Sequence, residues 1–96
     1  MNKYESVIIV KPNLSKVELE KVTLGIENKI NVLAKLTNKE DIGVRKLAYE
    51  IHKNKEGHYL LYQFEINNEN KDAAIGEIER FYRITDEIIK YIIVKI

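Results

Sequence analysis

The middle of the chain reads Gly43-Val44-Arg45-Lys46-Leu47-Ala48-Tyr49-Glu50-Ile51. Within this run Leu47, Tyr49 and Ile51 recur at a spacing of two. Two residues is the period of a β-strand, so the three side chains are expected on one face of a strand, with Arg45 preceding them on that face. The run therefore predicts one strand of a hairpin and a mixed apolar and basic surface on it.

The second strand of this hairpin is expected from about His58 to Ile66, after a predicted turn at Lys53–Gly57. Between Gly43 and Lys55 four cations stand against one carboxylate, a local net charge of +3 in a chain whose net charge is +1. Alternate residues of this strand point to opposite faces, and one of the two sets is wholly apolar or aromatic. That set should face the core: Leu60, Tyr62, Phe64 and Ile66.

Local sequence patterns predict a strand, a helix and an extended segment before the turn of the hairpin. The β-branched run Tyr4–Val10 ends before Pro12 and predicts a strand. Ser15 and Glu18 have the spacing of a capping box, so a helix begins there. Its apolar stripe steps by three and four residues through Leu19, Val22, Ile26, Ile30 and Leu33. The chain is then extended from Lys35 to Ile51, with an irregularity expected near Asp41–Gly43.

After the hairpin, Ala74–Tyr82 carries a second helical stripe, and Ile88–Ile96 is apolar on both parities. The order strand, helix, strand, strand, helix, strand predicts an α+β, ferredoxin-like fold: a four-stranded antiparallel sheet with two helices on one face. Because the first and last strands are apolar on both faces, we expect them to be the middle pair.

The opposite face of such a sheet has no helix to cover it. By parity this face should carry Val7, Ile9, Tyr59, Leu61 and one parity of the last strand, Ile88–Ile96. It would then be more apolar than a solvated face requires. An exposed patch of this kind predicts a partner surface. The alternative is that these residues are scattered and partly covered by long lysine stems.

Composition narrows the class of protein. Residues 1–96 form one domain, and 45% hydrophobic residues are typical of a globular chain. A net charge of +1 argues against a polycationic nucleic-acid coat, although a local basic patch remains compatible with it. The absence of cysteine excludes disulfides and thiolate chemistry and suits a reducing cytoplasm. No segment has the pattern of a secretion signal or a membrane span.

Signals for catalysis, metals and cofactors are lacking, so we expect no enzyme, no cofactor, no metal site and no small-molecule substrate. His52 and His58 flank the hairpin without a ligand cluster and are interpreted as ordinary surface or edge residues. Two alternatives with the same fold remain. An acylphosphatase-type hydrolase needs an arginine in the loop after the first strand, and Lys11–Leu14 has none. A small-molecule-binding regulatory module would dimerise through its sheet.

The hairpin cations have two interpretations. Lys53 and Lys55 are typical solvated turn residues, and cations on an edge strand discourage aggregation. Alternatively, a phosphate backbone is the ligand, because arginine presents a bidentate fork to phosphate oxygens. In that interpretation the contacting cations are Lys3, Arg45, Lys46, Lys90 and Lys95.

The run Gly43–Ile51 resembles the signature of the bacterial small-subunit ribosomal protein six (S6) family. Similarity extends over essentially the whole chain, through Lys3-Tyr4-Glu5 leading to Pro12-Asn13, Gly57 with Tyr59, and the terminal Val94-Lys95. The resemblance implies a ferredoxin-like, non-catalytic protein of the cytoplasmic ribosome. It further implies binding to the central domain of small-subunit rRNA together with small-subunit ribosomal protein eighteen, in assembly of the platform.

The resemblance also assigns roles to residues. It implies that Arg45 and Lys46 belong to the family's basic contact region, with Lys3 as a second contact and Lys90 and Lys95 as further ones. For the protein partner we expect a surface formed by Tyr49, from its position in the signature, and by Tyr59 and Leu61, from the parity of their strand.

Overall fold

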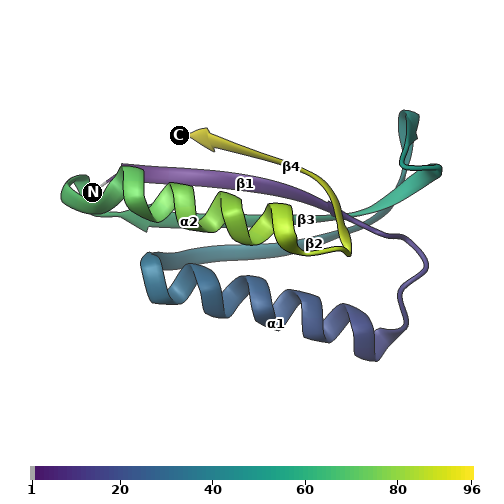
Figure 1. The fold of residues 1–96 in the computed structure, drawn as a ribbon, viewed down its shortest axis with the longest axis horizontal. Helices are drawn as coiled ribbons and strands as arrows, with labels where there is room; N and C mark the ends of the chain where they lie inside the picture. Colours follow the sequence, from purple (N-terminus) through teal and green to yellow (C-terminus); the bar gives the residue numbers. More distant parts are fainter. Residues whose placement is uncertain (1) are drawn as a thin grey trace.

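The structure, a computed structural model, describes residues 2–96 and confirms the predicted fold class. A four-stranded antiparallel sheet in the order β2-β3-β1-β4 carries both helices on one face (Figure 1). The elements are β1 (Asn2–Val10), α1 (Lys16–Leu33), β2 (Lys35–Ile51), β3 (Asn54–Ile66), a 3-10 turn η1 (Asn68–Asn70), α2 (Lys71–Ile84) and β4 (Ile88–Lys95). No helix in this part of the chain is long and apolar enough to span a bilayer.

The core lies between the sheet and the helices and follows the predicted periodicities. The four predicted residues of β3 are buried there, as are Val22, Ile26 and Ile30 of α1: Leu60, Tyr62, Phe64 and Ile66. The capping box is formed as expected. The Ser15 hydroxyl accepts from the Glu18 amide at 3.2 Å, and the Glu18 carboxylate accepts from the Ser15 amide at 3.1 Å. The hydrogen bond from the Ser15 amide to the carboxylate lowers the pKa of Glu18, because it favours the charged form of that group.

The prediction that β1 and β4 form the middle pair is wrong, because β3 and β1 are central and β4 is an edge strand. One face of β4 packs its Tyr91 and Ile93 against the core. The other face leaves Ile92 and Val94 exposed on the side of the sheet without helices. Apolarity on both parities therefore reflects an uncovered face rather than a central position.

The predicted turn at Lys53–Gly57 is also wrong. Ile51 pairs with Asn54, so the turn consists of His52 and Lys53 alone, with φ angles of 47° and 66°. Positive φ at both central residues is the pattern of a type I′ hairpin turn, whose twist matches that of the flanking strands. The Asn54 side chain closes the turn by donating to the His52 carbonyl at 3.2 Å. The polar residues after the turn belong to an exposed strand.

Candidate partner and nucleic-acid interface

The sheet face without helices, called here the open face, has an apolar floor that crosses three strands. Val7 of β1 lies opposite Leu61 of β3 and Ile92 of β4, and Ile9 lies opposite Tyr59. Residues opposite each other in an antiparallel pair project to the same face, so these side chains form two adjacent rows. Val7, Tyr59 and Leu61 are half-buried, whereas Ile92 is 52% exposed. The expected apolar patch is present.

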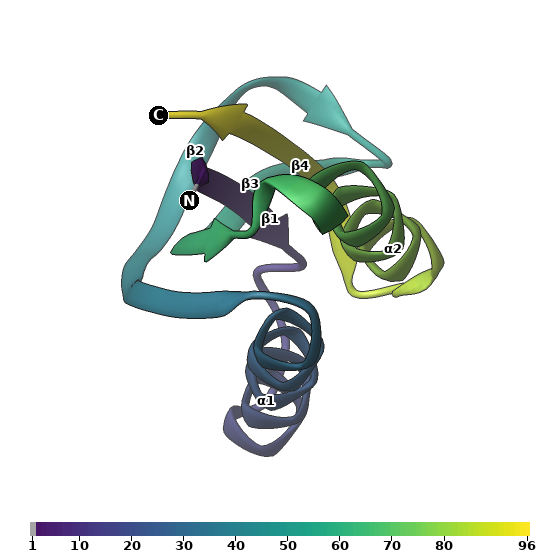
Figure 2. The same cartoon turned by 90° about the vertical axis from the view of Figure 1, so that its left-hand side faces the viewer.

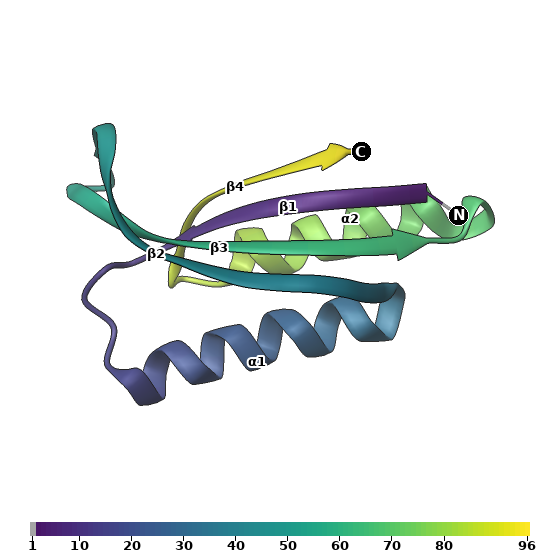
Figure 3. The same ribbon diagram turned by 180° about the vertical axis from the view of Figure 1, so that it is seen from behind.

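A two-stranded extension of the sheet, called here the arm, consists of residues 45–57. It begins where β1 stops pairing with β3, at Val10 and His58. The arm bends out of the plane of the sheet (Figures 1 and 3), and end-on β2 arches over the strands (Figure 2). Leu47 anchors the arm and is only 8% exposed. An isolated two-stranded ribbon is marginally stable, so this contact with the sheet holds the arm in place.

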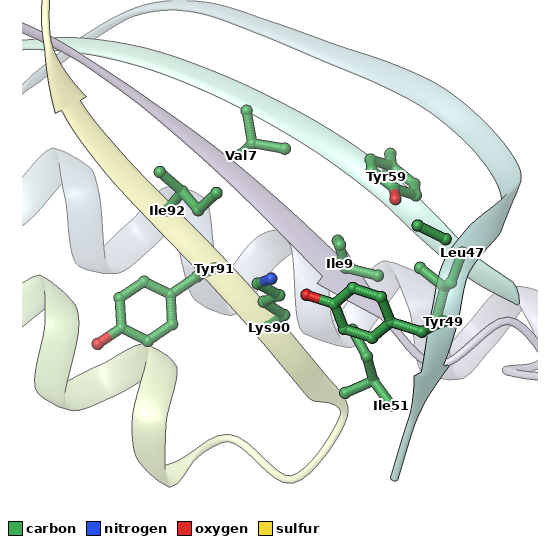
Figure 4. Close-up of a pocket in the computed structure, with 10 residues that line it drawn as sticks. Val7, Ile9, Leu47, Tyr49, Ile51, Tyr59, Lys90, Tyr91 and Ile92 are labelled. Atoms are coloured by element: carbon green, nitrogen blue, oxygen red, sulfur yellow. The ribbon is translucent and has the colours of Figure 1, made fainter. Parts of the chain in front are cut away.

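Between the arm and the open face lies a hollow of about 210 Å³. Leu47, Tyr49 and Ile51 of the arm face Ile9 of β1 and Lys90 of β4 across it (Figure 4). The Lys90 amine lies 6.0 Å from the centroid of the Tyr49 ring, within the range of a cation–π contact. Tyr49 nevertheless remains 69% exposed. The hollow therefore has a fixed floor and an accessible aromatic wall.

The three residues expected to bind a protein partner lie on this one surface. Tyr49 and Tyr59 line the hollow, and Leu61 lies in the neighbouring row of the open face. Their partner role stays a prediction. Ile92 belongs to the one parity of the last strand that was expected on this face. Leu47 and Ile51 were not predicted as part of the site, although they carry the same period-two signal as Tyr49.

The five cations expected to contact phosphate do not form one patch. Lys90 lies opposite Ile9, so it belongs to the open face, whereas Lys95 lies opposite Tyr4 on the helix-bearing face. Arg45 and Lys46 are consecutive in β2, and consecutive strand residues project to opposite faces. Lys3 is exposed near the start of β1 on the open-face parity. The cations thus surround the sheet rather than cover one side of it.

All five cations are exposed, and none forms an ion pair with a carboxylate among residues 2–96. The Arg45 guanidinium donates to the neighbouring Val44 carbonyl at 3.0 Å. Elsewhere in the same part of the chain Lys29 pairs with Glu77 at 3.4 Å, Lys39 with Glu27 at 3.0 Å and Arg83 with Glu79 at 3.7 Å. The cations around the sheet are therefore free to bind an anion.

The histidines show no ligand geometry. His58 contacts Asp41 at 2.5 Å, and the same carboxylate oxygen accepts from the Gly43 amide at 2.9 Å. Gly43 has a φ of 95°, and the register shifts between Asp41 and Gly43, which confirms the predicted irregularity. His52 sits in the hairpin turn. Within residues 2–96 no group of three potential metal ligands is found. Asp41 and His58 thus stabilise a bulge.

Comparison with known proteins gives a consistent result. The family model described as "Ribosomal protein S6" matches residues 3–95. Small ribosomal subunit protein bS6 of Sulfurovum sp. (strain NBC37-1) is 40% identical over 99% of this chain and 72% of that protein. The bS6 protein of Thermoanaerobacter pseudethanolicus is 37% identical over 99% and 97%. The crystal structure of 30S ribosomal protein S6 from Thermotoga maritima superimposes with a TM-score of 0.88 at 35% identity, covering 99% of this chain and 87% of that one.

Proposed function

Because the chain belongs to the ribosomal protein S6 family, a non-enzymatic family of the small ribosomal subunit, we propose that it binds the central domain of small-subunit rRNA. Binding uses backbone phosphates and takes place together with small-subunit ribosomal protein eighteen. The pair supports assembly of the platform and thereby translation. The protein acts in the cytoplasm as part of the ribosome.

One observation carries this proposal: around an uncovered apolar sheet face lie exposed cations that pair with no carboxylate among residues 2–96. Phosphate oxygens suit the cations, and arginine adds a bidentate fork. Phosphate contacts position a protein without reading base sequence. We assign this role to Lys3, Arg45, Lys46 and Lys95. Lys90 is a further candidate for a phosphate contact, but it differs from the other four because it lines the hollow.

The apolar part of the surface suits a protein rather than RNA. Burying Tyr59, Leu61 and Ile92 against another polypeptide removes apolar area from water, which a hydrated phosphate backbone does not do. Tyr49 adds an aromatic side chain of the kind that dominates protein interfaces. With a net charge of only +1, the chain is expected to bind RNA weakly alone and to depend on this partner.

The alternatives are weaker. The hydrolase is excluded by membership of a non-enzymatic family, and the loop Lys11–Leu14 carries no arginine. For a small-molecule-binding module, the apolar hollow of about 210 Å³ lies below the roughly 300–1,000 Å³ usual for ligand pockets.

The rRNA contact is tested by the double substitution Arg45→Ala with Lys46→Ala. Both side chains are exposed, so the fold should persist while rRNA affinity falls about tenfold or more at 0.1 M salt, because two phosphate contacts are lost. The slope of log affinity against log salt should become shallower by roughly 1.4–1.8. Filter binding or anisotropy at several salt concentrations measures both quantities.

A matched control for this test also removes one lysine and one arginine charge, but from the helices, by Lys16→Ala with Arg80→Ala. Both residues are exposed and form no ion pair among residues 2–96. The control should leave affinity and slope close to those of the parent protein. An equal loss in both double variants would show a general charge effect and contradict the assignment. Unfolding of the Arg45/Lys46 variant would show that those side chains are structural.

A further inference from the structure

We propose that the hollow between the arm and the open face receives one apolar side chain of a polypeptide partner. Lys90 then recognises a carboxylate beside that side chain rather than an rRNA phosphate. This deepens the proposed function and rests on it only for the identity of the partner, ribosomal protein eighteen. It changes the role of Lys90 from that of a phosphate contact to that of a residue that determines partner specificity.

The size and walls of the hollow select an apolar side chain. Its volume of about 210 Å³ lies below the range usual for small-molecule pockets, which suits a single side chain. Aliphatic side chains from three strands form most of the wall: Val7, Ile9, Leu47, Ile51 and Ile92. A nucleobase placed there would leave its polar edge without enough hydrogen-bonding partners, which carries a desolvation cost.

Charge complementarity selects an acidic neighbour. Lys90 projects onto the open face beside the hollow and has no carboxylate partner among residues 2–96. On the same face of β1, Glu5 lies opposite Val94, four residues along the strand from the Ile9 that pairs with Lys90, and it accepts a hydrogen bond from Gln63 at 3.0 Å. When a partner covers the apolar floor, water leaves the surroundings of Lys90, and an ion pair becomes stronger in that environment. A partner segment with an apolar residue next to a carboxylate would fill the hollow and pair with the Lys90 amine at the same time.

The arm completes this site from above. Leu47 holds the arm against the sheet, whereas the Tyr49 ring extends from it toward Lys90 and stays exposed (Figure 4). A bound side chain would lie between the Tyr49 ring and the floor at Ile9. Aromatic residues next to a filled pocket are typical of binding hot spots. The site therefore depends on both the arm and β4.

A small probe tests the chemistry of the hollow without any ribosomal component. ¹⁵N-labelled full-length protein is titrated with N-acetyl-L-leucine and with N-acetyl-L-leucinamide, which lacks the carboxylate. Chemical-shift changes should concentrate at the residues around the hollow, and the acid should bind about two- to fivefold more tightly, as expected for one partly exposed ion pair. Lys90→Met should abolish this preference. Lys95→Met, on the same strand but the other face, should retain it.

Two results of this titration would overturn the proposal. The first is equal binding of acid and amide to the parent protein. The second is that the residues around the hollow show no chemical-shift changes, whether or not residues elsewhere do. Neither result depends on rRNA or on ribosomal protein eighteen, so the proposed function is judged separately.

A second experiment separates the two roles of the lysines. Lys90→Met should weaken binding of ribosomal protein eighteen, measured without RNA, about fivefold, and should leave the salt slope of rRNA binding unchanged. Lys95→Met should do the reverse and make the slope shallower by roughly 0.7–0.9. If Lys90→Met changes the slope and spares partner binding, Lys90 is a phosphate contact. The inference then fails although the proposed function stands.

Discussion

Replacing Gly57 with alanine is expected to destabilise the protein by about 1–3 kcal/mol, the usual cost of adding a carbon to a packed site. An ideal Cβ at Gly57 would lie 2.2 Å from Cγ2 of Ile9 and 3.5 Å from Leu47. Ile9 is 8% exposed, and its Cγ2 is attached to a branched Cβ with restricted rotation, so it cannot turn aside. Gly57 is thus the point where the arm crosses β1 closely enough to exclude any side chain.

Thermal denaturation measures this effect, because about 1 kcal/mol shifts the melting temperature of a domain this size by roughly 4–8 °C. Gly76→Ala is the matched control. Nothing lies within 4 Å of its ideal Cβ, and alanine in a helix interior should stabilise by about 0.5–1 kcal/mol. In an Ile9→Ala background Gly57→Ala should cost less, since the clashing methyl group is gone. An unchanged melting temperature for Gly57→Ala alone would contradict the packing described for the arm.

Stability is expected to fall steeply between pH 10 and pH 12 because of two buried tyrosines. Burial raises the pKa of Tyr82 to about 12, although the hydrogen bond to Ser6 at 3.1 Å opposes part of this rise. Burial also raises the pKa of Tyr62. In the unfolded chain a tyrosine has a pKa near 10, so above that pH the unfolded state releases protons that the folded state retains. The free energy of unfolding therefore has its full value below pH 10 and declines above it.

The expected decline is about 1.4 kcal/mol per pH unit for each such tyrosine. Urea denaturation at steps from pH 8 to pH 12 measures it. Lysines also titrate in this range, so the informative quantity is the difference between the parent protein and Tyr82→Phe. That variant loses the hydrogen bond to Ser6 at every pH but should show a shallower alkaline decline. If the parent and Tyr82→Phe decline in parallel, Tyr82 is not the group responsible.

The sequence predicted those features of the fold that depend on local periodicity and capping. The alternation in β3 assigned Leu60 and Phe64 to the core, and the Ser15–Glu18 spacing located the start of α1. The position of β4 was not predictable from its composition. A strand with one face on the core and the other uncovered is as apolar as a central strand. The turn was missed because His52 and Lys53 adopt positive φ without the glycine or asparagine that usually indicates it.

The candidate site was predictable in part for a related reason. Parity assigned Tyr59 and Leu61 to the open face, and the same rule already implies that Arg45 and Lys46 project oppositely. The bend of the arm was not predictable. It brings Tyr49 within 6.0 Å of Lys90, a residue 41 positions later in the chain. Strand periodicity fixes which face a side chain occupies, but not how a two-stranded arm curves over its own sheet.

The most direct test of the central claim is a titration of a central-domain rRNA fragment, with and without ribosomal protein eighteen, over a range of salt concentrations. With about four phosphate contacts, the slope of log affinity against log salt should be roughly −3 to −4. Binding should be weak for the protein alone and clearly tighter with its partner. Equal affinity with and without ribosomal protein eighteen, or no binding under either condition, would contradict the account.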